Sequence, residues 1–174
     1  MEQDEMGISR MGRYVIDGES GQISKSQVIS DVDLTWGVGL YAYRDRLSAG
    51  MSPGQIKDIY WTSFGLWKEL VTKFIYDLYK DYKYRAVPVT DILRLAQQGV
   101  PASLFRLHAS DESLHIANSF KFPQGYMVSS PQFVPTFDGS DGSTDGYIVC
   151  AIVFDNMERQ LILCVKQIAN STKL

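Results

Sequence analysis

The sequence predicts a mainly β protein with one helical insertion. A hairpin signal covers residues 13–29, where two β-forming runs flank a turn that contains Gly18 and Gly21. Apolar residues recur at helical spacing from Ile56 to Tyr82. From residue 102 onward, short β-forming runs follow one another at a spacing of about ten residues, which is typical of an antiparallel sheet or of propeller blades.

Length and charge place the chain among ordinary globular domains. Its 174 residues carry a net charge of −3, with 45% hydrophobic and 21% charged residues, which favours one folded domain and excludes wholesale disorder. Because no block of Lys and Arg is present, we expect no nucleic-acid partner. The acidic start and the lack of a run of about 18 apolar residues predict neither a secretory signal nor a membrane span.

The N-terminal part is expected to contain the first blade-like strands. Residues 1–12 are polar and should form a loose end. Residues 13–50 should then supply strands, first the hairpin and next an extended stretch at residues 37–43. In that stretch, Gly37 and Gly39 indicate a β-bulge or a close approach of backbone.

Residues 52–98 are predicted to be the helical insertion. Ser52 can cap a helix in which Pro53 takes the first position, and the pattern from Ile56 to Tyr82 predicts a helix of up to 27 residues, in one piece or broken at Gly65. Its aromatic stripe is more typical of core than of a ligand box. Thr90 and Asp91 should cap a shorter helix that ends at Gln98, with Gly99 in the C′ position.

The remainder, residues 102–174, is predicted to return to strands. The β-forming runs are residues 103–108, 116–122, 149–154 and 161–165. Two of them contain the only cysteines, Cys150 and Cys164, which we expect to be buried thiols in a reducing, cytoplasmic compartment.

The two histidines are the first candidates for chemistry. His108 and His115 could share a metal site with Asp111 or Glu112, since imidazole and carboxylate are common metal ligands. The favoured interpretation is plainer: two polar side chains on a surface hairpin.

Other motifs are equally incomplete. Residues 138–145 alternate oxygen-bearing side chains like a calcium loop, but they lack the terminal Glu and flanking helices, so an acidic turn is favoured. No Gly-x-Ser-x-Gly elbow and no P-loop occur. The residues alone therefore assign no catalytic, cofactor-binding or metal-binding position.

Several motifs occur in a recognisable order along the chain. They are residues 13–17 (RYVID), 35–41 (TWGVGLY), 120–123 (FKFP), 129–135 (SSPQFVP) and 143–150 (STDGYIVC). In this order and spacing the chain resembles the carotenoid cleavage oxygenase family from about Arg13 to Phe154. Each motif by itself is weak evidence for the family, and the resemblance rests on the order in which the motifs occur.

The resemblance implies a specific fold and activity. Family members are seven-bladed β-propellers with a helical cap over an apolar tunnel. Four His hold a non-haem Fe(II), and O₂ is added across a conjugated C=C bond of a carotenoid or apocarotenoid. The aromatic helix from Ile56 to Tyr82 would correspond to the cap, and its apolar face suits a polyene drawn from a membrane, so peripheral membrane contact is expected.

The chain departs from the family pattern at its metal site. It matches a stretch between the family's third and fourth iron His, and neither His108 nor His115 falls at a ligand position. Ser130 stands where the family carries a Glu that orients a ligand. We therefore expect a partial propeller, a fragment of a dioxygenase that binds no iron and is inactive alone. Its open sheet edges should favour self-association.

Two other hypotheses remain open. The chain could be a non-catalytic module that binds an apolar ligand or a protein partner, a function to which its 12% of aromatic residues is suited. It could also be a decayed gene product with no independent role.

Overall fold

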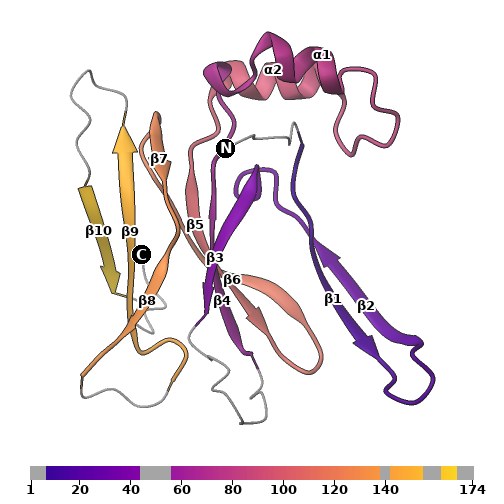
Figure 1. Cartoon of the computed structure of the whole chain (residues 1–174), viewed down its shortest axis with the longest axis vertical. Coiled ribbons are helices and arrows are strands. Elements are labelled where there is room, and N and C mark those ends of the chain that lie inside the picture. The colour runs from indigo at the N-terminus through magenta and orange to yellow at the C-terminus, as the bar shows by residue number, and fades with distance from the viewer. Residues whose placement is uncertain (1–6, 44–55, 138–141, 155–161, 168–174) are drawn as a thin grey trace.

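The computed structural model describes residues 7–43, 56–137, 142–154 and 162–167. Within these ranges, three antiparallel sheets stand side by side and two helices lie across one end of them (Figure 1). None of the described sheets closes on itself. The predicted mainly β class with antiparallel sheets is therefore confirmed.

The first sheet is the predicted hairpin, formed by β1 (Met11–Ile16) and β2 (Ile23–Ile29). In its turn, Gly21 has a positive φ of 68°, which glycine adopts without strain. The prediction of a loose end up to residue 12 is wrong for its described part. Ile8 forms a β-bridge with Trp36, and Met11 is buried in the core.

The central sheet has the strand order β3-β4-β5-β6, so each strand pairs with its neighbour in sequence. Its members are β3 (Val38–Tyr43), β4 (Asp58–Ser63), β5 (Ser103–Ala109) and β6 (Leu114–Lys121). The register between β3 and β4 shifts at Gly39, which confirms the predicted bulge.

The long helix predicted from Ile56 to Tyr82 is wrong. Its first part is β4, whose side chains are buried on one face and mostly half-buried on the other, so it lacks the alternation of apolar and polar residues that marks a half-exposed strand. Gly65 has a φ of 78°, and a Cβ there would lie 2.4 Å from the carbonyl oxygen of Val100, so the chain turns sharply at this point. The predicted start of this helix at Ser52 and Pro53 lies outside the described residues.

The helical part is correspondingly short. It consists of a single 3-10 turn (Lys68–Leu70), α1 (Lys73–Tyr79) and α2 (Val89–Gln98). The hydroxyl of Thr72 accepts a hydrogen bond from the backbone of Ile75 and thereby caps α1. The second predicted helix is confirmed, with Gly99 at its end; it begins after Pro88 rather than at a Thr90 or Asp91 cap.

The third sheet is built around β9 (Gly146–Phe154). β10 (Ile162–Gln167) pairs along one edge, and β7 (Tyr126–Val128) and β8 (Gln132–Pro135) follow one another along the other edge. The sequence predicted β9 and β10, and β5 and β6 before them. Its predicted β-forming runs did not include β4, β7 or β8.

Side chains along the central strands point alternately to the two faces of the sheet, and a hydrophobic core forms on each face. On β4, Tyr60 faces the third sheet, where it packs with residues such as Leu104 and Ile148. The neighbouring Ile59 and Trp61 face the hairpin, where they pack around Phe105. A third cluster, formed by Trp36, Leu66, Ile92, Ala96 and Val100, lies under the helices.

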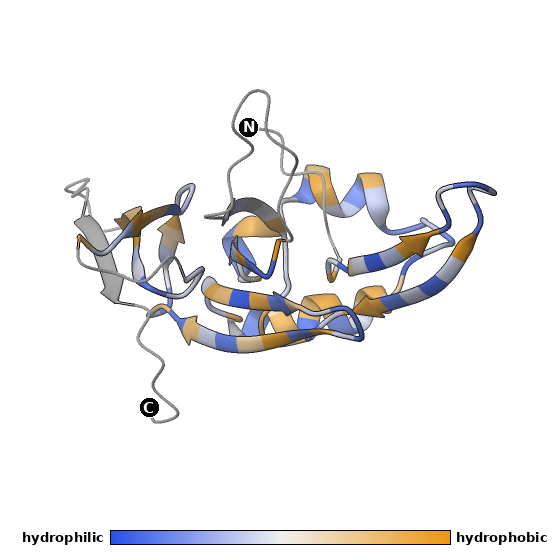
Figure 2. Cartoon of the chain, turned by 90° about the horizontal axis from the view of Figure 1, so that it is seen from below, coloured by the Kyte–Doolittle hydropathy of each residue, from blue (hydrophilic) through white to orange (hydrophobic). Residues whose placement is uncertain are grey.

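Both ends of this stack carry exposed apolar side chains. On the hairpin these are Tyr14, Ile16, Ile23 and Val28; on the third sheet they are Met127, Val134 and Val153. Figure 2 shows apolar segments on the strands at the two ends of the molecule. Soluble monomers seldom leave such patches uncovered.

Candidate functional site

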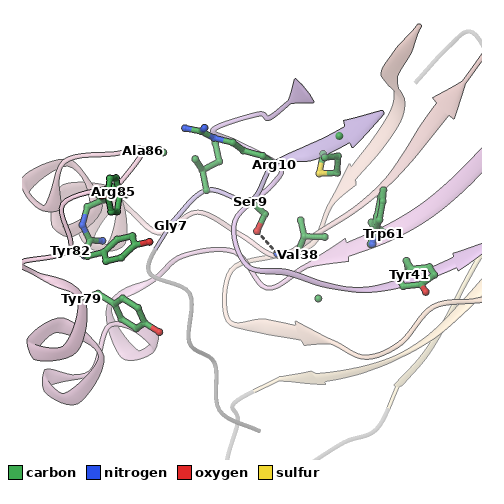
Figure 3. Close-up of a pocket in the computed structure, with 15 residues that line it drawn as sticks. Gly7, Ser9, Arg10, Val38, Tyr41, Trp61, Tyr79, Tyr82, Arg85 and Ala86 are labelled. Atoms are coloured by element: carbon green, nitrogen blue, oxygen red, sulfur yellow. Dashed lines mark hydrogen bonds between the residues drawn. The ribbon is translucent and has the colours of Figure 1, made fainter. Parts of the chain in front are cut away.

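A cavity of about 990 Å³ lies between the sheets and the helical segment (Figure 3). Three parts of the chain line it. They are residues 7–12, which include the start of β1; the strand residues Val38, Gly39, Tyr41 and Trp61; and the end of α1 with the segment that follows it (Tyr79, Tyr82, Tyr84, Arg85 and Ala86). Its volume lies at the upper end of the range of about 300–1,000 Å³ that is usual for small-molecule sites.

Aromatic pairs form two walls of the cavity. On the sheet side, the rings of Tyr41 and Trp61 meet edge to face with centroids 5.8 Å apart. On the helical side, Tyr82 and Tyr84 meet in the same way at 5.9 Å. Tyr41, Tyr82 and Tyr84 are each more than half exposed, so the cavity opens to solvent between them. Such walls offer ring faces and edges to a planar apolar ligand.

Two described charged side chains line the cavity, and both are arginines. Arg10 and Arg85 line it, whereas no Asp or Glu does among the residues that the structure describes there. In Figure 3 both side chains lie on the side of the cavity nearer Tyr82. Among the described residues, the lining therefore combines aromatic side chains with two arginines.

A second polar centre lies at the end of the central sheet. Asp58, which is 3% exposed, accepts hydrogen bonds from Arg106 Nη1 at 2.8 Å and from the hydroxyl of Ser143. Its Oδ1 also lies 3.1 Å from His108 Nδ1. Because Ser143 precedes β9, this carboxylate joins the central sheet to the third sheet.

The environment of Asp58 keeps it ionised. Burial by itself raises the pKa of this carboxyl, but the hydrogen bonds from Ser143 and His108 and the charge of Arg106 outweigh burial and hold the pKa below its ordinary value of 3.8. A weakly basic carboxylate whose oxygens already accept several hydrogen bonds is poorly suited to take a proton from a substrate. We therefore regard Asp58 as a structural ion rather than a base.

The structure places the two histidines opposite each other on the β5–β6 hairpin, with ring centroids 5.5 Å apart. His115 is exposed, and His108 reaches back to Asp58. Asp111 and Glu112 lie in the exposed turn, where the carbonyl oxygen of Asp111 accepts a hydrogen bond from Arg13. No group of three His, Cys, Asp or Glu within the described ranges is arranged to hold a metal.

The four-histidine iron centre implied by the resemblance is not matched by this chain. The whole sequence contains two His, and one of them is engaged with a buried carboxylate. Ser130, at the position where the family carries a Glu, is exposed in the bend between β7 and β8. The residues present do not fit that iron centre.

Two of the motifs that carry the resemblance, residues 129–135 and 143–150, pair with each other in the third sheet. Phe133, Val134 and Pro135 of β8 pair with Ile148, Tyr147 and Gly146 of β9. The ring of Phe133 also stacks on Tyr60 of the central sheet, with centroids 5.8 Å apart. The acidic loop between these strands lies partly outside the described residues. Within its described part, Asp145 accepts a hydrogen bond from Thr136 across the hairpin.

Of the cysteines, Cys150 is buried in the core between the central and third sheets, as predicted. Cys164 lies directly opposite it in the register of β9 and β10.

Sequence patterns alone did not identify the cavity. Its lining comes from segments that are far apart in the chain, and only the density of Tyr at positions 76, 79, 82 and 84 marks one of them. Likewise, the partners of Asp58 lie 48, 50 and 85 residues away from it.

Comparison with protein-family models, curated proteins and solved structures found no match. Among the described helices, none has the length and hydropathy that a membrane crossing needs.

Proposed function

We propose that this chain forms consecutive blade-like sheets of an oxygenase that resembles the carotenoid cleavage family, and that it holds an apolar polyene substrate. The observation that carries the proposal is the aromatic cavity between the sheets and the helical segment, where Tyr41 and Trp61 face Tyr82 and Tyr84. A conjugated polyene is planar and polarizable, so aromatic walls favour its binding.

The arrangement of the sheets supports the proposal in a second way. The central sheet is a four-stranded antiparallel meander whose two faces are covered by neighbouring sheets. Propeller blades have this strand order and pack in this manner. The apolar end faces of the stack are compatible with further sheets on either side.

Exposed side chains on α1 support peripheral contact with a membrane. Phe74 and Leu78 are 71% and 56% exposed and lie one helical turn apart. Lys73 and Lys80 flank them; both form exposed ion pairs with Asp77, which anionic headgroups would replace on contact with a membrane. A polyene substrate partitions into bilayers, so an apolar contact of this kind would bring the cavity near its source.

A non-catalytic binding module is the second candidate. The observation that favours it is that the cavity is bounded by residues of this chain, whereas the chain lacks the His for a four-histidine iron centre. A module would retain the polyene without converting it.

One experiment addresses both candidates. The purified chain is incubated with all-trans-retinol, Fe(II) and O₂ and passed through a size-exclusion column. The protein fraction is then extracted for intact polyene and for the carbonyl products of C=C cleavage. We expect intact polyene at about one per chain and no product. Absence of bound polyene would contradict both candidates, and cleavage by the chain alone would contradict the expectation that it is inactive by itself.

A further inference from the structure

The two histidines stand in one row with the buried Asp58 across three neighbouring strands. Asp58 of β4 is the register partner of His108 of β5, and His108 is in turn the partner of His115 of β6. Register partners point to the same face of a sheet, so the three side chains lie next to one another. The row lies at the end of the central sheet away from α1 and α2 (Figure 1). It runs from the buried carboxylate to the exposed His115 on β6, the last strand of that sheet.

Asp58 determines which nitrogen of His108 is available to a metal ion. Because Asp58 is ionised and paired with Arg106, it accepts the hydrogen bond, and His108 Nδ1 donates it over 3.1 Å. A neutral imidazole carries one N–H, so Nε2 of His108 keeps the lone pair that a metal ion needs. Carboxylates commonly orient metal-binding histidines in this way. The side chain of His108 is 35% exposed, so an ion can reach its ring from solvent.

We propose that His108 and His115 together bind one divalent transition-metal ion such as Zn²⁺, with water in the remaining coordination positions. Their ring centroids lie 5.5 Å apart. Two imidazoles that bind one ion through nitrogens about 2 Å from it have centroids roughly 4.5–5.5 Å apart at bond angles of about 90–120°. The two rings therefore stand at a separation that one ion can bridge.

The donor set indicates the class of ion. Imidazole suits Zn²⁺, Ni²⁺ and Cu²⁺, whereas Mg²⁺ and Ca²⁺ prefer oxygen ligands. The oxygens of Asp58 already accept hydrogen bonds from Arg106 and Ser143, and one of them also from His108, so this carboxylate orients a ligand and is not itself one. The charge of Arg106 is compensated by the same carboxylate. This site is separate from the aromatic cavity, and the inference does not depend on polyene binding.

The first test follows the imidazole nitrogens by NMR in the untagged chain. The sequence contains only two His, so a long-range ¹H–¹⁵N spectrum resolves both rings. Before metal is added, His108 should be the tautomer that carries its proton on Nδ1. On titration with ZnCl₂ at neutral pH, the signals of both rings should shift saturably at one Zn²⁺ per chain. MgCl₂ at the same concentrations should shift neither ring.

Variants assign the binding to its residues. His115→Gln should lose saturable Zn²⁺ binding and should fold normally, because His115 is exposed and its replacement breaks no buried contact. Glu112→Gln is the matched control, since Glu112 is exposed in the turn between the same two strands and carries a carboxylate. Its Zn²⁺ affinity should equal that of the native chain.

The role of Asp58 as a positioning residue has its own test. Asp58→Asn should weaken Zn²⁺ binding about tenfold, since the loss of a carboxylate that orients a histidine ligand costs 10–100-fold in affinity. An unchanged affinity would overturn this role. If Asp58→Asn does not fold, the tautomer of His108 in the native chain decides, and a proton on Nε2 would overturn it equally.

Three outcomes would overturn the metal site itself. They are Zn²⁺ binding that persists in His115→Gln, a shift of one ring without the other, and loss of binding in Glu112→Gln, which would assign the ion to the turn. Absence of any saturable shift in the native chain would overturn it as well. None of these results bears on polyene binding, which the retinol experiment tests separately.

Discussion

Removing the carboxylate of Asp58 should destabilise the chain more than any single change at an exposed acidic residue. The side chain is 4% exposed, and Asp58→Ala leaves Arg106 Nη1 and the Ser143 hydroxyl without their acceptor. Breaking a buried ion pair by deleting one partner costs about 3–5 kcal/mol. Because the Arg106 side chain keeps 21% exposure and part of its hydration, we expect a loss of about 3 kcal/mol in the free energy of unfolding, at the lower end of that range.

The assay is urea unfolding followed by circular dichroism. Asp77→Ala is the control, since Asp77 forms ion pairs with Lys73 and Lys80 on the surface of α1 and should change stability by no more than about 0.5 kcal/mol. Ser143→Ala should cost about 1.5 kcal/mol, because Asp58 keeps its other partners. If Asp58→Ala and Asp77→Ala prove equally mild, the view of Asp58 as the ion that joins two sheets is refuted.

Three further results are expected. Because the pKa of Asp58 is lowered in the folded chain, the stability that this group contributes is complete above its unfolded pKa and is lost as the pH falls through the folded value. The gap in urea midpoint between native chain and Asp58→Asn should therefore narrow below about pH 4, and a constant gap would contradict this. The apolar ends of the stack predict self-association: the urea midpoint should rise with protein concentration, and a high midpoint independent of concentration would count against it. The double variant Phe74→Asp/Leu78→Asp should lose co-sedimentation with anionic liposomes while its circular dichroism stays native, whereas undiminished sedimentation would exclude α1 as the contact.

The local elements of the fold were largely predictable from sequence. The hairpin, the bulge at Gly39 and the helix ending at Gly99 depend on turn chemistry and short-range periodicity, which the residues themselves display. These signals need no knowledge of distant contacts.

The segment that begins at Ile56, predicted as helix but folded as β4, shows where prediction from sequence periodicity fails. Ile56, Ile59 and Tyr60 happen to follow helical spacing, but β4 lies in the central sheet and is covered by neighbouring sheets on both faces. A strand in that position has apolar residues on both sides, and short apolar runs of this kind cannot be separated from helix by periodicity. Packing against the neighbouring sheets, rather than the local sequence pattern, therefore determines that this segment is a strand.

The candidate site was less predictable than the fold. Its aromatic walls join β3 and β4 to the segment after α1, which also contains Arg85, and Arg10 comes from one further stretch. A pattern within one stretch of sequence does not show that distant stretches come together in space. The Tyr-rich run ending at Tyr84 is the one local indication, and its part up to Tyr82 falls within the long cap helix that the sequence predicts.

The central claim is that the aromatic cavity binds an apolar polyene, and Trp61 reports on it directly. Trp61 lines the cavity, whereas Trp36 and Trp67 are buried elsewhere and do not line it. Titration with all-trans-retinol should quench tryptophan fluorescence saturably at about one ligand per chain, and Trp61→Phe should abolish most of that quenching. Quenching that never saturates, or that is equally strong in Trp61→Phe, would contradict the claim.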